Sequence, residues 1–480
     1  MTFPLMGICH PISTFGRVPG HDARFIAHRA GVERLLASYR GLPPGTTVRL
    51  AKKTSNLFRT RADTAVPGLD VGGLAGIIAI EPDRMTADVG GMTTYEDLVA
   101  ATLPYGLSPL VVPQLKTITV GGAVTGIGIE SSSFRNGLPH ESVLEIDVLT
   151  GAGEIVTAKP AGAHADLFHG FPNSYGTLGY STRLRIRLEP VRPYVALRHL
   201  RFRELSELVS AIDRIVAERS HGGERVDYLD GVVFGRDESY LTLGRQTDEP
   251  GPVSDYTGMA IYYQSIRTRD TDRLTIHDYL WRWDTDWFWC SRYFGAQHPF
   301  VRRCWPKRYL RSSVYWKLIA LNNRYHIADR LRVYKGGARP ERVIQDIEVP
   351  IERTAEFLDW FLSEIPIEPV WLCPVRLCAP SASGTAPWPL YPIPAEKTYV
   401  NVGFWSTVPT AVDAREGAMN REIEGKVADL DGHKSLYSEA FYEKVDFDRL
   451  YGGHTYTTLK KRYDPENRLL DLYAKVVERK

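Results

Sequence analysis

The chain has 480 residues, of which 43% are hydrophobic and 24% are charged, and its formal net charge is +2. This length exceeds the usual limit for one hydrophobic core, so we expect two domains. The composition is typical of a soluble globular enzyme. The small net charge argues against a dedicated nucleic-acid-binding protein.

The cysteines and the amino terminus indicate a cellular setting. The cysteines are sparse and have no ligand-like spacing, which favours a reducing compartment and predicts no metal site. The amino terminus lacks a basic region and a long apolar run, and no window approaches the roughly 18 apolar residues of a membrane span. We expect a cytoplasmic protein, with peripheral contact to the inner face of the plasma membrane as an open possibility.

The first predicted element is an amphipathic helix over residues 24–40 with a basic outer face. A strand then begins at Thr47 and opens into a basic, hydroxyl-rich turn composed of Lys52, Lys53, Thr54, Ser55 and Asn56. This turn could hold a diphosphate, and an exposed basic turn is an equally good interpretation because the P-loop pattern is absent. Short strands follow at 76–80, 86–89 and 110–112, with a helix at 95–103.

Residues 113–137 form a stretch rich in glycine and hydroxyl groups with almost no bulky side chain. Gly121, Gly122, Gly126 and Gly128 can take positive φ and let main-chain N–H groups approach a pyrophosphate. Short hydrogen-bonding groups come from Thr117, Thr119, Thr125, Ser131, Ser132 and Ser133. A mobile surface loop is the alternative. Because apolar residues alternate with the small ones, we predict a half-buried loop between strands.

Further strands are predicted at 143–149 and 155–158, and a turn containing Gly176 and Gly179 leads into an alternating strand at 181–188. Short strands alternating with single helices indicate an α+β domain rather than a doubly wound sheet. A Rossmann unit would need G-x-G-x-x-G between a strand and a helix, and no such unit is present.

The order of these motifs resembles a known family. A-K-K-T-S-N, then T-I-T-V-G-G-A followed by I-E-S-S-S, then D-L-F and G-T-L-G-Y, resembles the FAD-binding domain of the vanillyl-alcohol oxidase and para-cresol methylhydroxylase superfamily over residues 50–190. I-E-S-S-S at 129–133 and W-L-C-P at 371–374 are similar to the Δ24-sterol reductase branch. The chain resembles still more closely the actinobacterial flavoproteins that act with a methyltransferase to make 10-methyl fatty acids.

The resemblance implies a domain plan and a cofactor. It implies a two-part FAD-binding domain at 1–190, an α+β cap with an antiparallel sheet at 191–440, and a segment at 441–480 that returns to the FAD-binding domain. The residues it assigns to FAD are Lys53, Thr54, Ser55, Asn56, Thr117, Thr119, Gly121, Gly122, Thr125, Gly126, Gly128, Ser131, Ser132, Ser133, Gly176, Thr177, Gly179 and Tyr180. The first turn contains no histidine or cysteine, so the flavin should be non-covalent. NADPH is the implied electron donor.

Residues 266–342 interleave tryptophan and tyrosine with arginine and lysine. This pattern suits the interface of an anionic membrane, and a packed cap core with solvated arginines is the alternative. Stacking on single-stranded nucleic acid fits poorly because the net charge is small. Later strands at 343–349, 370–373 and 398–404 would present alternate residues to the flavin, and the candidates are Gln345, Asp346, Glu348, Trp371, Tyr399 and Asn401.

The implied reaction is the reduction of a lipid carbon–carbon double bond, as in the conversion of a 10-methylene to a 10-methyl fatty acyl chain. Such a reaction needs a buried acid, and the candidates are His454, Tyr399, Glu130 and Asp346. Two alternatives remain. One is an oxidase or dehydrogenase of the same fold that acts on an alcohol, sugar lactone or hydroxy acid. The other is a non-catalytic lipid-binding protein.

Overall fold

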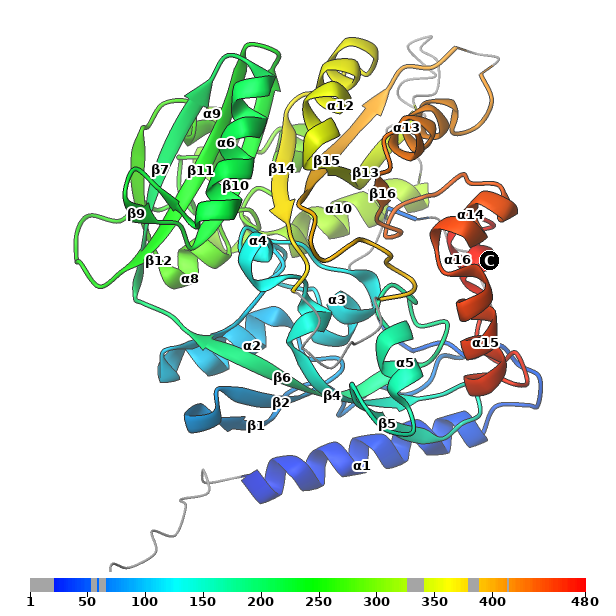
Figure 1. The fold of residues 1–480 in the computed structure, drawn as a ribbon. Helices are drawn as coiled ribbons and strands as arrows, with labels where there is room; N and C mark the ends of the chain where they lie inside the picture. Colours follow the sequence, from blue (N-terminus) through cyan, green and yellow to red (C-terminus); the bar gives the residue numbers. More distant parts are fainter. Residues whose placement is uncertain (1–20, 53–57, 60–65, 326–340, 379–387, 412–413) are drawn as a thin grey trace, which may run out of the picture.

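The computed structural model describes residues 21–52, 58–59, 66–325, 341–378, 388–411 and 414–480. Two antiparallel sheets lie one above the other in the view of Figure 1, and helices pack on the faces of both. The last long strand of the lower sheet ends at Pro190 and the first strand of the upper sheet begins at Tyr194. The mixture of helices and antiparallel sheets confirms the predicted α+β class.

The lower sheet has the strand order β1-β2-β6-β4-β5, with β3 paired to β6. Its strands are β1 (Ile77–Glu81), β2 (Thr86–Gly90), β3 (Leu107–Pro109), β4 (Val143–Leu149), β5 (Ile155–Ala158) and β6 (Tyr180–Pro190). Strand β6 is central because it pairs with β2, β3 and β4. Alternation along β6 places Leu184, Ile186 and Leu188 in the core, as the sequence predicted.

The helices of this half are α1 (His21–Arg40), α2 (Tyr95–Thr102), α3 (Val120–Gly126), α4 (Ser133–Asn136) and α5 (Ala165–Gly170), with short 3₁₀ turns η1 (Pro82–Arg84), η2 (Leu103–Tyr105) and η3 (Pro139–Ser142). Helix α1 runs beneath the sheet, whereas α2, α3 and α5 lie on the side that faces the upper half (Figure 1). The second half of α1 buries Leu35 and Tyr39. Its first half leaves Phe25 50% and Ile26 66% exposed, so the predicted apolar face covers only part of the helix.

The upper sheet has the order β12-β7-β11-β10-β14-β15-β13-β16. Its strands are β7 (Tyr194–Phe202), β10 (Tyr228–Gly235), β11 (Glu238–Thr247), β12 (Thr271–Thr275), β13 (Glu341–Pro350), β14 (Val370–Val375), β15 (Tyr399–Val408) and β16 (His433–Lys434), and a small hairpin joins β8 (Ser220–His221) to β9 (Glu224–Arg225). The predicted antiparallel cap sheet is therefore present, and the strands predicted at 343–349, 370–373 and 398–404 appear in it as β13, β14 and β15.

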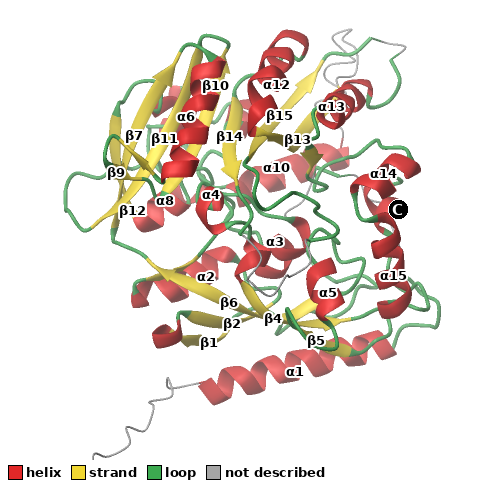
Figure 2. Cartoon of the chain, viewed as in Figure 1, coloured by secondary structure: helices red, strands yellow, loops and turns green. Residues whose placement is uncertain are grey.

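One face of the cap sheet packs on helices α6 (Leu205–Glu218), α12 (Ile351–Glu364) and α13 (Ala418–Asp429), as Figure 2 shows. Strands β13 and β15 send Ile347 and Val402 to this side. Because side chains alternate along a strand, Asp346, one residue from Ile347, and Trp405, three residues from Val402, point to the opposite face. This opposite face meets an aromatic segment that contains α7 (Tyr262–Ser265), α8 (Ile276–Leu280), η4 (Cys290–Phe294), α9 (Pro299–Cys304), η5 (Lys307–Tyr309) and α10 (Ser312–Tyr325).

Four tryptophans of this aromatic segment are inside the cap. Trp281, Trp283, Trp287 and Trp289 are at most 3% exposed. Arg282 is also buried, and its guanidinium pairs with Glu130 at 2.9 Å and Asp230 at 2.8 Å. The packed-core interpretation is therefore correct for these residues, and they form no aromatic belt at the surface.

The carboxyl-terminal helices α14 (Lys444–Leu450), α15 (Gly453–Tyr463) and α16 (Leu472–Val476) run down one side of the molecule towards the lower sheet (Figure 1). Lys460 Nζ donates to the Thr177 carbonyl at 2.9 Å, and Arg462 pairs with Asp166 at 2.7 Å. These contacts tie α15 to the lower half. Within the described ranges, every helix is too short or too polar to span a lipid bilayer.

Three local predictions of secondary structure were wrong. No strand forms at 110–112, because the pairing with β6 uses Leu107–Pro109 instead. The segment that begins at Thr47 makes only an isolated bridge, Leu50 with Leu69. The glycine-rich stretch is not a loop throughout, because α3 lies inside it.

Candidate active site

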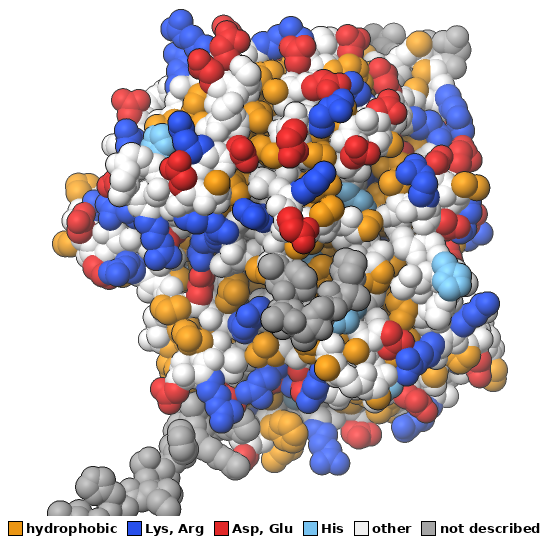
Figure 3. Space-filling view, viewed as in Figure 1, with side chains coloured by type: hydrophobic (Ala, Val, Ile, Leu, Met, Phe, Trp, Pro, Cys, Tyr) orange, Lys and Arg blue, Asp and Glu red, His pale blue; other side chains and the backbone are white. Residues whose placement is uncertain are grey.

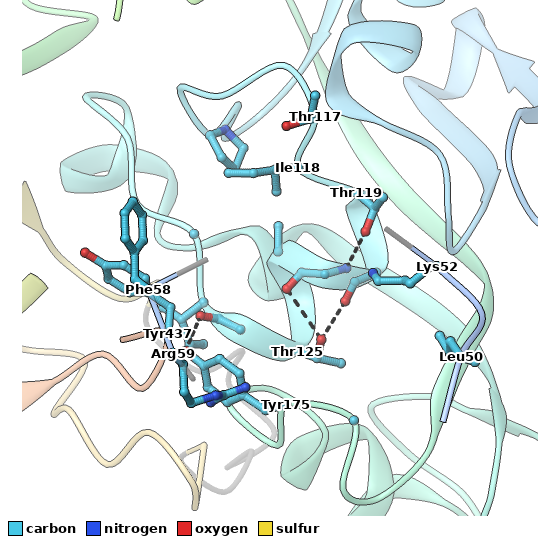
Figure 4. Close-up of a pocket in the computed structure, with 18 of the residues that line it drawn as sticks. Leu50, Lys52, Phe58, Arg59, Thr117, Ile118, Thr119, Thr125, Tyr175 and Tyr437 are labelled. Carbon is cyan, nitrogen blue, oxygen red and sulfur yellow. Dashed lines mark hydrogen bonds between the residues drawn. The ribbon is translucent and has the colours of Figure 1, made fainter. Parts of the chain in front are cut away.

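A cavity of about 980 Å³ lies between the lower half and the cap. Its described walls come from residues 47–52, 58–59, 113–129 and 175–181, from the cap residues Trp287, Phe288, Asp346, Trp371 and Trp405, and from carboxyl-terminal residues that include Ser435, Tyr437 and Lys475. The volume is at the upper end of the range for small-molecule sites. In Figure 4, Leu50 and Lys52 lie on one side of α3, and Phe58, Arg59, Tyr175 and Tyr437 lie on the other.

Helix α3 forms the floor of the cavity. Thr119 caps the helix, because its hydroxyl oxygen accepts a hydrogen bond from Gly122 N at 3.1 Å, and the Thr125 hydroxyl donates to the Gly121 carbonyl at 2.8 Å (Figure 4). Val120 and Val124 are buried beneath the helix. The opposite side of α3 therefore offers the cavity glycines and short hydroxyl side chains.

The glycines of the floor are needed for close packing rather than for positive φ. A Cβ atom on Gly121 would lie 2.2 Å from Ser181 Oγ and 2.7 Å from the Gly91 carbonyl oxygen. A Cβ atom on Gly128 would lie 2.8 Å from the ring of Pro113. The prediction of left-handed backbone at these positions was wrong, and left-handed φ occurs instead at Gly176 (φ 76°) and Gly179 (φ 144°).

The structure brings many of the predicted cofactor residues together. Those that line the cavity are Thr117, Thr119, Gly121, Gly122, Thr125, Gly126, Gly128, Gly176, Gly179 and Tyr180. Lys53, Thr54, Ser55 and Asn56 lie outside the described residues, although their neighbour Lys52 lines the cavity.

Four predicted cofactor residues do not line the cavity, because their hydroxyls are buried and bonded within the protein. Ser131 Oγ donates to Glu130 Oε1 at 2.7 Å, and Ser132 Oγ donates to the Leu110 carbonyl at 2.9 Å. Ser133 Oγ accepts from Glu130 N at 3.1 Å, and Thr177 Oγ1 donates to the Ser174 carbonyl at 2.7 Å. The three serines stabilise the turn that follows α3, and Thr177 stabilises the separate turn that begins at Ser174.

The cap closes one end of the cavity with aromatic rings. The ring centroids of Phe288 and Trp405 are 4.3 Å apart, and those of Phe288 and Trp371 are 5.4 Å apart. Phe58 approaches Trp287 at 5.5 Å from the other side. This end is therefore apolar and suited to a planar ring or an acyl chain.

Asp346 stands at this aromatic end. Its Oδ1 accepts a hydrogen bond from Asn401 Nδ2 at 3.3 Å, and it is hydrogen-bonded to the Tyr437 hydroxyl. Burial raises the pKa of Asp346 to about 7, although both hydrogen bonds act in the opposite direction. Gly403, the partner of Asp346 on β15, leaves room for the carboxyl group, since a Cβ there would lie 2.3 Å from Asp346 Oδ1. The site thus holds a carboxylic acid that is partly protonated at neutral pH.

The other predicted acids do not line the cavity. Burial raises the pKa of Glu130, but its carboxylate is paired with Arg282 behind the wall. Tyr399 is buried at the start of β15, and burial raises its pKa. His454 is exposed on α15. Of the four candidates, the structure places only Asp346 at the cavity.

Sequence reasoning missed several lining residues, including Arg59, Tyr175, Tyr437 and Lys475. Lys475 Nζ donates to the Tyr175 carbonyl at 2.6 Å, and the Tyr175 hydroxyl donates to the Gly126 carbonyl at 2.8 Å. These residues belong to segments far apart in sequence and outside regular motifs. Of these four residues, Tyr175 alone has a left-handed backbone, with a φ of 51°. It lies next to the predicted glycine turn.

The residues present fit FAD. The floor of α3 has no side chain that would block the polar diphosphate linker, and the aromatic end provides flat apolar walls for the ring system. The described lining contains no histidine or cysteine, the side chains that commonly link a flavin covalently. The fold and the site together fit the class of flavin-binding proteins.

Comparison with known proteins agrees with this class. Residues 45–159 match the FAD binding domain family. The chain is 25% identical over 444 residues to the Delta(24)-sterol reductase of Arabidopsis thaliana (85% of this chain, 76% of the relative) and 25% identical over 420 residues to that of Homo sapiens (84% and 76%). Cytokinin dehydrogenase 10 of Oryza sativa is 32% identical over 192 residues, which cover 39% of this chain and 34% of that protein.

The chain therefore carries an FAD-binding domain and is an FAD-dependent oxidoreductase homologous to the Delta(24)-sterol reductases along most of its length. The comparisons agree with the predicted resemblance to FAD-binding proteins and to the Delta(24)-sterol reductases, and they support FAD as the cofactor. The resemblance to the flavoproteins of 10-methyl fatty acid synthesis stays a prediction. The likeness to the dehydrogenase is confined to a shorter part of the chain.

Proposed function

We propose that the protein reduces a carbon–carbon double bond of a lipid, and that its substrate is the methylene group of a 10-methylene fatty acyl chain, which becomes a methyl group with electrons from NADPH. The observation that carries the proposal is the position of Asp346. Among the described lining residues it is the one carboxylic acid, and it stands at the aromatic end of the cavity.

This arrangement suits an isolated alkene. Reduction adds one hydrogen with an electron pair to one carbon and a proton to the other, and reduced FAD, when bound, supplies the first of these. Asp346 supplies the proton to the terminal methylene carbon, so that positive charge develops at the more substituted carbon. The rings of Phe288, Trp371 and Trp405 exclude water and hold the chain beside the acid.

The surroundings of Asp346 favour its acid form. The buried carboxyl of Glu348 lies two residues along β13, on the same face of the strand, and burial raises the pKa of Glu348 well above its ordinary value, as burial also raises that of Asp346. Ser435, which lines the cavity, donates its hydroxyl to Glu348 Oε1 at 2.9 Å. Asn401 and the Tyr437 hydroxyl hold the Asp346 carboxyl in place.

The sterol reductases support the reaction class, because their name states the reduction of a sterol. The fatty acyl substrate is supported by the resemblance to the flavoproteins of 10-methyl fatty acid synthesis. It makes a fatty-acid methyltransferase the enzyme that supplies the substrate. We further propose that both enzymes act in the cytoplasm.

Two measurements test the proposal. Anaerobic mixing with NADPH should bleach the bound flavin, whereas bleaching by an alcohol or hydroxy acid, with none by NADPH, would indicate an oxidase or dehydrogenase instead. Lipids from cells that make the methyltransferase should contain a methylene species, which disappears when this protein is also made. If the methylene species persists, the substrate assignment is wrong. A protein that cannot take up FAD would contradict enzymatic function altogether.

A further inference from the structure

A patch of exposed apolar and basic side chains lies around helix α9. Its apolar members are Met259 (53% exposed), Phe300 (72%) and Tyr309 (42%). Its basic members are Arg303, Lys307 and Arg308, which are all exposed. We call these six residues the α9 patch. A soluble surface rarely keeps a phenylalanine this exposed beside other apolar residues without a binding role.

Buried contacts hold the α9 patch in place. Arg302 is a residue of α9 whose side chain is buried. It pairs with Asp286 at 2.7 Å and donates to the carbonyl oxygens of Gly258 at 2.7 Å and Ala260 at 3.0 Å. Met259 lies between these two residues, so Arg302 fixes its loop beside the helix that carries Phe300. Lys307 pairs with Asp255 at 3.0 Å and ties η5 to the same loop.

The segment that carries most of the α9 patch contains positively charged side chains and no negatively charged ones. Residues 287–325 contain no aspartate or glutamate, and their basic residues are Arg292, Arg302, Arg303, Lys307, Arg308, Arg311, Lys317 and Arg324. Arg302, Lys307 and Arg311 have acidic partners elsewhere in the fold. Arg303 and Arg308 remain as exposed positive charge beside Phe300 and Tyr309. By contrast, positive and negative side chains are interspersed over much of the face in Figure 3.

The same segment reaches the cavity. It begins at Trp287 and Phe288, which line the cavity wall, and continues through η4 to α9. Phe294 of η4 stacks on Tyr315 of α10 with ring centroids 5.9 Å apart. One continuous stretch of chain thus connects the aromatic end of the cavity to the α9 patch.

We propose that the α9 patch docks the protein on the surface of an anionic lipid bilayer, from which the lipid substrate is taken; this rests on the proposed function. Phe300 and Met259 enter the boundary between headgroups and acyl chains, and Arg303 and Arg308 pair with lipid phosphates. The buried tryptophans of the cap take no part. The combination of exposed apolar tips with flanking cations matches a bilayer better than an acidic protein surface, which would need the cations but not the apolar tips.

The test is sedimentation of the FAD-loaded protein with vesicles. We expect binding to vesicles that contain phosphatidylglycerol, weaker binding to pure phosphatidylcholine, and release at high salt. Each basic residue near an anionic surface contributes about 1 kcal/mol, so Arg303→Ser with Arg308→Ser should weaken binding about thirtyfold. Phe300→Ser should weaken binding at every salt concentration at which the unchanged protein still binds.

The matched control is Val445→Ser with Arg84→Ser, which removes an apolar side chain (80% exposed) and a basic one elsewhere on the surface. This control should bind vesicles as the unchanged protein does. The proposal would be overturned if the control lost as much vesicle binding as the variants of the α9 patch. It would also be overturned if the protein bound both vesicle types equally, or did not bind anionic vesicles. So would displacement by an acidic acyl carrier protein, which would make the patch a protein site.

Vesicle binding does not require turnover, so this result is independent of the proposed function. A protein that reduces detergent-dispersed lipid but ignores anionic vesicles would overturn the docking proposal alone. A protein that binds anionic vesicles through the α9 patch but reduces no alkene would leave the docking intact and refute the reaction.

Discussion

The floor and the aromatic end of the cavity are built in different ways. The floor comes from one continuous stretch around α3, whose small side chains are fixed by local packing against β6. The aromatic end is assembled from β13, β14, β15, the segment at Trp287 and a turn that carries Tyr437. Cofactor binding therefore depends on a local motif, whereas the chemistry depends on the pairing of strands that are distant in sequence.

The largest effect should come from Asp346→Asn at the aromatic end. Removing a general acid typically costs about 10²–10⁴-fold in rate, so product formation should fall by that amount. Bleaching of the flavin by NADPH should stay near normal, because the floor is untouched. The two readouts are stopped-flow absorbance and mass spectrometry of the lipid. Equal loss of both would mean that Asp346 supports the fold or the flavin rather than proton transfer.

A smaller effect is expected at the floor from Gly121→Ala. The added Cβ meets Ser181 Oγ and the Gly91 carbonyl, and overpacking of this kind costs about 1–3 kcal/mol. The free energy of unfolding should fall by about 1–3 kcal/mol. The shifted floor should also hold FAD more weakly, as measured by flavin release during dialysis. Gly425→Ala in α13 is the control, because no atom lies within 4 Å of its added Cβ. If the control loses as much FAD as Gly121→Ala, the packing argument fails.

The pH dependence distinguishes the two regions further. Burial raises the pKa of Asp346 from its ordinary value to about 7, so the acid form is present below pH 7 and is lost above it. Turnover should be level below about pH 7 and fall about tenfold per unit above it. FAD affinity should not follow this curve. A rate that rises through the same range would contradict Asp346 as an acid.

The smallest effect is expected from Gly403→Ala, which changes no ionisable group. Its Cβ would displace the Asp346 carboxyl, and a misplaced acid should lower turnover several-fold. The pH at which turnover falls should also move, since Asp346 would change its contact with Asn401. The pH profile of this variant shows whether turnover depends on where the acid stands as well as on its being present. An unchanged rate and profile would show that the site tolerates the shift.

The difference between the regions also explains what could be predicted from sequence. The α+β class and strands such as β4 and β5 could be predicted from the pattern of apolar residues, and much of the cavity floor could be predicted from the glycine- and hydroxyl-rich stretch at 113–137. The helix α3 was missed because its glycines have low helix propensity, and packing over Val120 and Val124 overcomes it. Burial of Ser131 and Thr177 could not be seen, because a short hydroxyl can bond either a ligand or its own turn.

The sequence also could not show that Asp346 is the candidate acid that lies at the cavity. Asp346, Glu130, Tyr399 and His454 were comparable candidates until the sheet register placed Asp346 opposite Gly403 and beside Asn401. The tryptophan-rich segment was ambiguous for the same reason, since composition does not tell which aromatic side chains point inward. The pairing of distant strands determines which acid lies at the cavity, and the packing of the cap determines which aromatic side chains are buried.

Reduction carried out in D₂O tests the central claim most directly. If Asp346 delivers a solvent-exchangeable proton to the terminal methylene carbon, the new methyl group must contain one deuterium, located by mass spectrometry and NMR of the product. A methyl group without deuterium would contradict the account.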